Sequence, residues 1–218
     1  MSNTMNKNKR EQIKENERIV KALKKDGKKL YSYSKLSTIE QCPYQAYLSY
    51  IAPEYIREQG RNNIWAILGG KLHQVLENIV NGETATKTIR NFTDKAVLEA
   101  ELNGYEFSTE TIRNNWIANV KHFCNTFRKP QGDYTTEEFF LYRLDNNHYL
   151  QGYIDLIKRK KNGKIDIIDW KTSSLYKGDA LEKAKYQLAI YAMACENMGF
   201  KVDRIGWNFI KYAKILKL

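Results

Sequence analysis

At 218 residues the chain fits one domain with a sizeable core, and its formal net charge of +11 favours a polyanionic partner, nucleic acid first and an anionic membrane surface second. It contains no run of about 18 apolar residues, and its lysine-rich N-terminus has no stretch of signal-peptide type, so we expect an intracellular protein without a transmembrane helix. Three widely spaced cysteines without a Cys-x-x-Cys pair argue against a disulfide framework or a zinc ribbon, and 15 tyrosines with four tryptophans exclude a chain that is wholly a disordered basic tail.

The N-terminal residues 1–29 are basic and carry only a weak apolar stripe. We expect a solvated, frayed helix or arm, with an arm that contacts phosphates as the functional alternative. Residues 31–51 then predict a helix that one of three serines could cap and that Cys42–Pro43 interrupts or restarts. The serines are Ser32, Ser34 and Ser37.

Apolar periodicity predicts three further helices and then a change to strands. The helices are expected at residues 64–80 (closed by Gly82), 84–102 and 108–129. Aromatic residues recur at near-heptad spacing in the third, which is more typical of a core stripe than of a nucleic-acid platform. After Pro130 we expect strands at 135–144, 149–158 and 164–172, a helix at 179–198 and a final strand at 202–212.

Two aspartates and a lysine lie inside the apolar strands of the expected hairpin. Asp155 follows Ile154, and Asp169 precedes Lys171 by two residues. A buried carboxylate needs a partner or a metal, so the pair suggests a divalent-metal site, and the lysine suggests an anionic substrate. The alternative is a surface hairpin with these charges facing solvent, but the isoleucine-rich strands disfavour it.

The register of this hairpin decides whether the two aspartates can meet. Asn162–Gly163 marks a tight turn. A three-residue loop, 161–163, pairs residue 160 with residue 164 and places Asp155 opposite Asp169. A two-residue loop sends Asp155 to the other face, because a slip of one residue inverts every side chain. We predict the three-residue loop.

Five short segments, in this order along the chain, resemble motifs of one protein family. They are Tyr33–Leu36 with Cys42–Pro43, Gly69–His73, Gly152–Asp155, Asp169–Thr172 and Gln187–Tyr191. Together they resemble the PD-(D/E)XK nuclease superfamily, in particular its RecB/AddB-like branch, which includes RecB-type nucleases of CRISPR adaptation and many phage exonucleases. Each segment alone is a weak signal, whereas five in order are a strong one.

The resemblance, which covers residues 31 to 212, implies an α/β fold with a restriction-endonuclease-like core. Its mixed β-sheet would be flanked by helices in the order αβββαβ, with a helical insert at about 83–130. We therefore expect a basic N-terminal extension at 1–30 and a nuclease domain at 31–218.

The resemblance also implies the roles of the site residues. His73, Asp155 and Asp169 would be metal ligands, with the backbone carbonyl of Trp170 as a further one. Lys171 would be the catalytic lysine. Gln187 and Tyr191, four residues apart and so on one helix face, would lie beside the site.

The chemistry of these groups is consistent with the implied roles. Carboxylate oxygens suit Mg²⁺, and one imidazole increases tolerance for Mn²⁺. The metal and the ammonium of Lys171 would stabilise negative charge that grows on the phosphate in the transition state. Lys171 could also orient or deprotonate the attacking water.

Several of these residues have a structural alternative. A lone histidine on an apolar helix, such as His73, is more often structural. Glu77, one turn further on, could support the site or be solvated. Glu138 could help the site from the preceding strand, although we expect it to face solvent. Gln187 and Tyr191 could be polar contacts of the core. His122 and His148 have no motif around them and are interpreted as structural or surface residues.

One feature departs from the branch, some of whose members bind a [4Fe-4S] cluster through one upstream and three C-terminal cysteines. Cys42 has the upstream position, but no cysteine follows Cys195, and Cys124 lies in the helical insert. We therefore expect no iron–sulfur cluster in this chain, and we interpret Cys42 as a small buried hydrophobic residue.

These observations lead to a functional expectation and an alternative. We expect a Mg²⁺- or Mn²⁺-dependent DNA nuclease, by resemblance an exonuclease acting on single strands or duplex ends in recombination, repair or phage DNA processing. It would work in the cytoplasm or nucleoid, within a larger assembly in some cases, and without a membrane. The alternative is a non-catalytic nucleic-acid-binding or assembly module that retains the fold.

Overall fold

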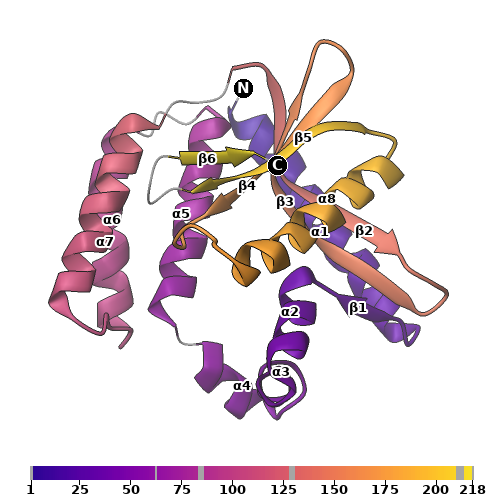
Figure 1. Cartoon of the computed structure of the whole chain (residues 1–218), viewed down its shortest axis with the longest axis horizontal. Coiled ribbons are helices and arrows are strands. Elements are labelled where there is room, and N and C mark those ends of the chain that lie inside the picture. The colour runs from indigo at the N-terminus through magenta and orange to yellow at the C-terminus, as the bar shows by residue number, and fades with distance from the viewer. Residues whose placement is uncertain (1, 62, 83–85, 128–130, 210–213, 218) are drawn as a thin grey trace.

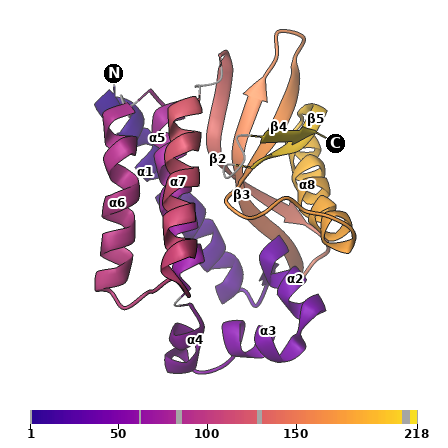
Figure 2. The same cartoon turned by 60° about the vertical axis from the view of Figure 1, so that its left-hand side comes forward.

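The computed structural model describes residues 2–61, 63–82, 86–127, 131–209 and 214–217. A mixed sheet forms the centre of the molecule, with helices on both of its faces (Figures 1 and 2). The described helices are α1 (Ser2–Lys25), α2 (Tyr33–Gln41), α3 (Pro43–Tyr50), α4 (Glu54–Arg61), α5 (Ile64–Val80), α6 (Thr86–Leu102), α7 (Glu110–Thr126) and α8 (Asp179–Asn197). The described strands are β1 (Lys29–Tyr31), β2 (Asp133–Arg143), β3 (His148–Arg159), β4 (Lys164–Lys171), β5 (Lys201–Phe209) and β6 (Lys214–Lys217).

The sheet is organised around the long strand β3. Its order is β1-β3-β4-β5-β6, and β2 also pairs with β3. The β2–β3, β3–β4 and β5–β6 pairs are antiparallel, whereas β1–β3 and β4–β5 are parallel. Helix α8 makes the crossover between the parallel strands β4 and β5, as parallel pairing requires. The expected mixed α/β fold with flanking helices is confirmed.

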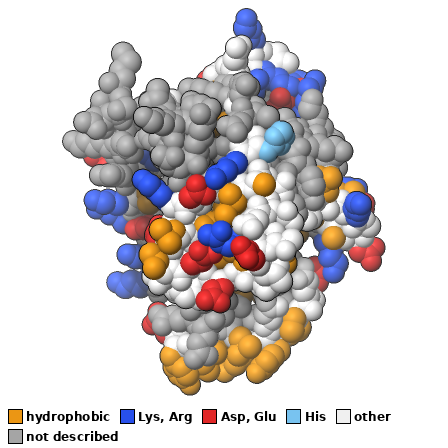
Figure 3. All heavy atoms as spheres, turned by 90° about the vertical axis from the view of Figure 1, so that its left-hand side faces the viewer, with side chains coloured by type: hydrophobic (Ala, Val, Ile, Leu, Met, Phe, Trp, Pro, Cys, Tyr) orange, Lys and Arg blue, Asp and Glu red, His pale blue; other side chains and the backbone are white. Residues whose placement is uncertain are grey.

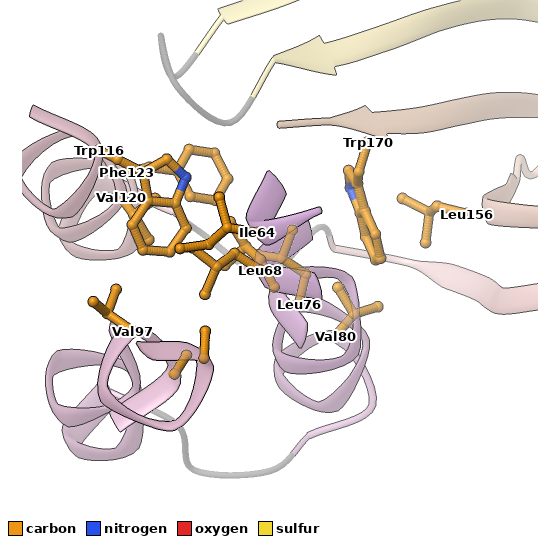
Figure 4. Packing of buried hydrophobic residues seen from close by; sticks show 13 residues of the cluster. Ile64, Leu68, Leu76, Val80, Val97, Trp116, Val120, Phe123, Leu156 and Trp170 are labelled. Atoms are coloured by element: carbon orange, nitrogen blue, oxygen red, sulfur yellow. The ribbon is translucent and has the colours of Figure 1, made fainter. Parts of the chain in front are cut away.

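Two hydrophobic cores hold the layers together. One joins α5, α6 and α7 to the sheet through Leu156 and Trp170, and Figure 4 shows these two side chains pointing from the strands toward α5. The other packs α8 against the opposite side of the sheet, around Leu188 and Trp207. Figure 2 shows α5–α7 and α8 on the two sides of the strands.

Helix α5 agrees with its predicted limits of 64–80. Asn63 caps it by accepting a hydrogen bond from the backbone N–H of Trp65 at 2.9 Å, and Gly82 follows its end with a φ of 95°. Its buried stripe is Ile64, Leu68, Leu72, Leu76 and Val80. Burying each such side chain contributes about 1.5–3 kcal/mol, so the orientation of α5, and of every group it carries, is firmly set.

The β3–β4 hairpin has the predicted three-residue loop. The N–H of Lys160 donates to the carbonyl of Lys164 at 2.8 Å, and Gly163 has the left-handed φ of 75° that this loop requires. The ladder runs from Arg159 opposite Ile165 to Leu156 opposite Ile168. In the same register the next position places Asp155 opposite Asp169.

Three short elements lie outside the sequence prediction. Strand β1 pairs with the first residues of β3, α4 follows α3, and β6 pairs with β5. Elements of three, eight and four residues carry too few positions to show a period. The predicted final strand ends at Phe209, and residues 210–212 lie outside the described part of the chain, as do residues 84, 85, 128 and 129 of the two predicted insert helices.

Most of the N-terminal segment is one continuous helix, α1, which is the helical form of the predicted helix or arm. Most of its described side chains are exposed, as predicted, but some contact the body of the protein or line the hollow beside it. Lys9 forms an ion pair with Glu77, and Asn16 lies beside the hydroxyl of Tyr153. None of the helices within the described ranges is long and apolar enough to cross a membrane.

Candidate active site

Asp155 is the buried carboxylate around which the site is built. It is 7% exposed, and its Oδ2 accepts a hydrogen bond from the backbone N–H of Trp170 at 2.6 Å. Its Oδ1 lies 3.4 Å from Nδ1 of His73. A carboxylate buried in an apolar hairpin needs a partner, and Asp155 has these two.

His73 reaches this carboxylate from α5. Its ring meets Trp170 edge to face, with centroids 6.0 Å apart. Burial lowers the pKa of His73, but the hydrogen bond and charge of Asp155 outweigh that effect and raise it overall. His73 therefore faces the predicted site and not the core stripe of α5.

Glu137 is a third potential metal ligand beside His73 and Asp155. It was not predicted from the sequence, where only its neighbour Glu138 was considered for the site. In the β2–β3 ladder, Thr136 lies opposite Leu156 and Glu138 opposite Ile154, so Glu137 falls opposite Asp155. Its φ of 51° is left-handed, which is uncommon for a residue other than glycine. Burial and the charge of Asp155 raise the pKa of Glu137.

A sequence signal for Glu137 did exist in the β2–β3 turn. The N–H of Leu144 donates to the carbonyl of His148 at 2.9 Å, so the loop is the three residues 145–147. Applying to Asp145–Asn147 the same loop rule that succeeded for the second hairpin would have placed Glu137 opposite Asp155.

His73, Glu137 and Asp155 form a group suited to a cation. One potential ligand atom from each lies within 4.8 Å of the other two. Two carboxylate oxygens and one imidazole nitrogen are donors that Mg²⁺ or Mn²⁺ accepts. The unfavourable clustering of two partly buried carboxylates is what a divalent cation would relieve. The donor set thus fits a divalent metal.

Asp169 lies outside that group and contacts the predicted catalytic lysine instead. Its Oδ2 is 2.8 Å from Nζ of Lys171. The amide of Gln187 joins the two, because its Nε2 donates to Oδ1 of Asp169 at 3.2 Å and its Oε1 accepts from Lys171 at 2.8 Å. Nε2 also donates to the hydroxyl of Tyr191 at 2.8 Å. The structure therefore brings together all four of these predicted residues.

The burial of this second cluster shifts its titration. Burial raises the pKa of Asp169 to about 6, although the charge of Lys171 opposes the shift. For Lys171, burial lowers the pKa, but the adjacent carboxylate of Asp169 raises it overall. Burial and the nearby aspartates raise the pKa of Tyr191. Lys171 is therefore a cation at neutral pH, and Tyr191 is a neutral hydroxyl.

A hollow of about 580 Å³ lies beside the His73–Glu137–Asp155 group. Glu77 lines it, pairs with Lys9 of α1 and accepts a hydrogen bond of 3.4 Å from Thr136. Lys9 and Ile13 of α1 form another part of its wall. The predicted neighbour Glu77 thus borders the site, and α1 closes one side of it.

The remaining sequence candidates lie elsewhere or have other contacts. Trp170 contacts Asp155 through its backbone N–H, whereas the atom predicted to bind metal was the backbone carbonyl of Trp170. His148 pairs with Asp145 in the β2–β3 turn. His122 is exposed on α7. Cys42 is not a buried hydrophobic residue: it is half-buried, and its Sγ accepts the N–H of Gln45 at the start of α3.

Comparison with known proteins adds a family to this geometry. A family model described as the PD-(D/E)XK nuclease superfamily matches residues 31–213. No curated protein matches the chain in sequence. Among solved structures, one titled "Crystal structure of SSO0001" is similar, with 18% identity and a TM-score of 0.41. The match covers 87% of this chain and 66% of that one, so this chain spans just under two thirds of its length.

Proposed function

This chain belongs to the PD-(D/E)XK nuclease superfamily, and we propose that it is a divalent-metal-dependent deoxyribonuclease that hydrolyses phosphodiester bonds. One observation supports this activity most. The group His73, Glu137 and Asp155, which can hold a cation, adjoins a buried lysine–carboxylate pair, Lys171 with Asp169. Binding of nucleic acid alone does not need that combination.

We propose that His73, Asp155 and Glu137 would hold the cation, with Asp169 and the carbonyl of Trp170 as the further ligands that the resemblance implies. When bound, the cation would polarise a phosphate oxygen and lower the pKa of an attacking water. Asp169 would then have two roles, since it also holds Lys171.

Lys171 would supply fixed positive charge to the phosphate. Its ammonium is held by Asp169 and Gln187, so it is oriented before the substrate arrives. A preoriented cation stabilises the growing negative charge of the transition state more than the ground state. Gln187 and Tyr191 would act by positioning Lys171 and Asp169.

The finer features of the proposal rest on the resemblance of the five motifs to the RecB/AddB-like branch. We propose exonuclease action on single strands or duplex ends, in recombination, repair or phage DNA processing, with Mg²⁺ or Mn²⁺. Residues 31–218 would form the nuclease domain and residues 1–30 its basic extension. A larger recombination or repair assembly would be the setting in the cell.

Degradation of labelled DNA with and without divalent metal tests the activity. We expect Mg²⁺- or Mn²⁺-dependent loss of linear strands, little attack on closed circular single strands, and no activity in Asp155→Ala or Lys171→Ala protein. Undiminished cleavage by either variant would refute the mechanism. A salt-dependent gel shift by folded wild-type protein, with no cleavage under any divalent metal, would favour the non-catalytic binding module instead.

A further inference from the structure

A second cavity, of about 450 Å³, lies on the other side of α5 from the hollow beside the cation-binding group. Its floor is apolar and buried, made by Leu72, Trp116 and Val120. Figure 4 shows Trp116 and Val120 extending from α7 toward α5. The volume is within the range of sites that take small organic ligands.

Polar groups surround this floor, and among the described residues that line the cavity none is charged. Asn115 and Asn119 lie one turn apart on α7, and Thr172, Ser173 and Ser174 follow β4. No hydrogen bond of these five side chains occurs within the described part of the chain. The amides and hydroxyls therefore offer donors and acceptors to a neutral, polar-edged ligand.

An exposed tryptophan forms one side of the opening. Trp65 is 46% exposed, although it lies on α5 beside a fully buried stripe. Phe107 holds its ring edge to face at 5.3 Å, and Phe107 is itself 6.1 Å from Trp116. Phe107, which lies between α6 and α7, thus holds the aromatic face of Trp65 at the surface. On this side of the molecule hydrophobic side chains lie exposed among charges of both signs (Figure 3).

Two glycines separate the cavity from the candidate active site. Gly69 lies midway between Trp65 and His73, which are about 12 Å apart along the axis of α5. A Cβ at Gly69 would lie 3.3 Å from Oγ1 of Thr172, the residue that follows Lys171, whereas a Cβ at Gly70 would meet nothing within 4 Å. The helix surface between the cavity and the site is therefore open at Gly70, while Thr172 borders it closely at Gly69.

The two hollows differ in the chemistry they offer. The hollow at the cation-binding group has charged residues and suits phosphates with their cation. The cavity beyond α5 has an aromatic face, an apolar floor and neutral hydrogen-bonding groups, which suit a nucleobase. A base of duplex DNA is stacked and paired, so only an unstacked base of a single strand can enter such a cavity.

We propose that this cavity binds one unstacked base of a single DNA strand whose backbone passes over Gly69–Gly70 to the candidate active site. Trp65 stacks on the base, and Asn115, Asn119 and the hydroxyls after Lys171 bind its edge. This inference rests on the proposed nuclease function and specifies its substrate as a single strand.

Binding without cleavage tests the cavity separately from the activity. In EDTA and at one salt concentration, the full chain is titrated with a 12-nucleotide oligothymidylate and with an abasic strand of equal length and charge. We expect oligothymidylate to bind about 5- to 150-fold more tightly, the range for stacking of one base. It should also quench tryptophan emission, because the other three tryptophans are at most 8% exposed.

Variants assign the effect to Trp65. Trp65→Leu should remove both the quenching and the preference for bases, whereas Trp65→Phe should keep much of the preference. Tyr55→Leu, which removes a 66%-exposed aromatic ring of α4, should behave as wild type. Equal binding of the two strands by wild type, or a base preference retained in folded Trp65→Leu protein, would overturn the proposal.

The outcomes also separate the nuclease function from the base-binding cavity. Base-specific binding without cleavage in Mg²⁺ or Mn²⁺ would refute the nuclease function and leave the base-binding cavity standing. Cleavage with no preference for bases would refute only the cavity.

Discussion

At the scale of single residues, the site depends on one backbone conformation that sequence propensity does not favour. Glu137 has a left-handed φ of 51°, which costs roughly 1–2 kcal/mol for a residue with a Cβ. The β2–β3 register is the same on both sides of it, so the strain is confined to this residue. Such strain persists where the surrounding structure imposes it, and here it accompanies a carboxylate beside His73 and Asp155.

Glu137→Gln tests whether this carboxylate contributes to cation binding. The amide keeps the size of the side chain but lacks its charge, so we expect Mn²⁺ affinity to fall by at least about tenfold. Isothermal titration of wild type and variant measures the change. Glu138→Gln is the matched control, since Glu138 is the half-buried neighbour outside the group, and an equal loss in both variants would contradict the assignment.

Gly152, in the motif that leads to Asp155, has a packing reason to be glycine. A Cβ there would lie 2.8 Å from the ring of Phe140, which is 3% exposed and packs against Tyr191. We expect Gly152→Ala to destabilise the protein by about 1–3 kcal/mol in denaturant unfolding. Adding Phe140→Leu should recover part of that loss, and a fully stable Gly152→Ala single variant would be inconsistent with this contact.

At the scale of elements, the sequence was sufficient where a local signal sets the geometry. The loop at Asn162–Gly163 fixed the β3–β4 register, and with it the position of Asp155 opposite Asp169. The long apolar stripe fixed α5, which carries His73. The motif order on its own indicated that Gln187 and Tyr191 lie close to Asp169.

Elements whose position depends on tertiary contacts could not be predicted in the same way. Strand β1 has three residues and forms only because β3 offers a free edge to it. The path of α1 depends on Lys9 and Asn16 finding partners on α5 and β3. Glu137 differs from these elements, because its place opposite Asp155 follows from the three-residue loop at 145–147, and only its left-handed backbone has no signal in the sequence.

Helix α1 places a positive charge at the hollow beside the cation-binding group. Lys9 pairs with Glu77 and lines the same hollow as Glu137. Because an ammonium repels a divalent cation, we expect Lys9→Gln to increase Mn²⁺ affinity by roughly threefold to tenfold. Titration at low salt measures this, with Lys14→Gln, an exposed lysine of the same helix, as control. Unchanged Mn²⁺ binding in Lys9→Gln protein would show that this charge does not affect the site, and weaker binding would contradict the repulsion.

For the whole molecule, the net charge of +11 favours DNA binding whose affinity falls as salt concentration rises. Each neutralised phosphate of a single strand contributes a slope of about −0.7 to log K against log[salt]. Contacts with at least three phosphates between the cavity and the site should therefore give a slope of about −2 or steeper. Binding of oligothymidylate in EDTA across a salt series checks this, and a slope near zero would exclude phosphate-dominated binding.

A crystal structure with Mn²⁺ would show whether α5, β2 and β3 hold a divalent cation beside Lys171. Anomalous scattering should show a peak contacting His73, Glu137 and Asp155 in the wild type, and this peak should be lost in Asp155→Asn protein. A peak elsewhere, or none at this group in crystals whose protein binds Mn²⁺ in solution, would contradict the account.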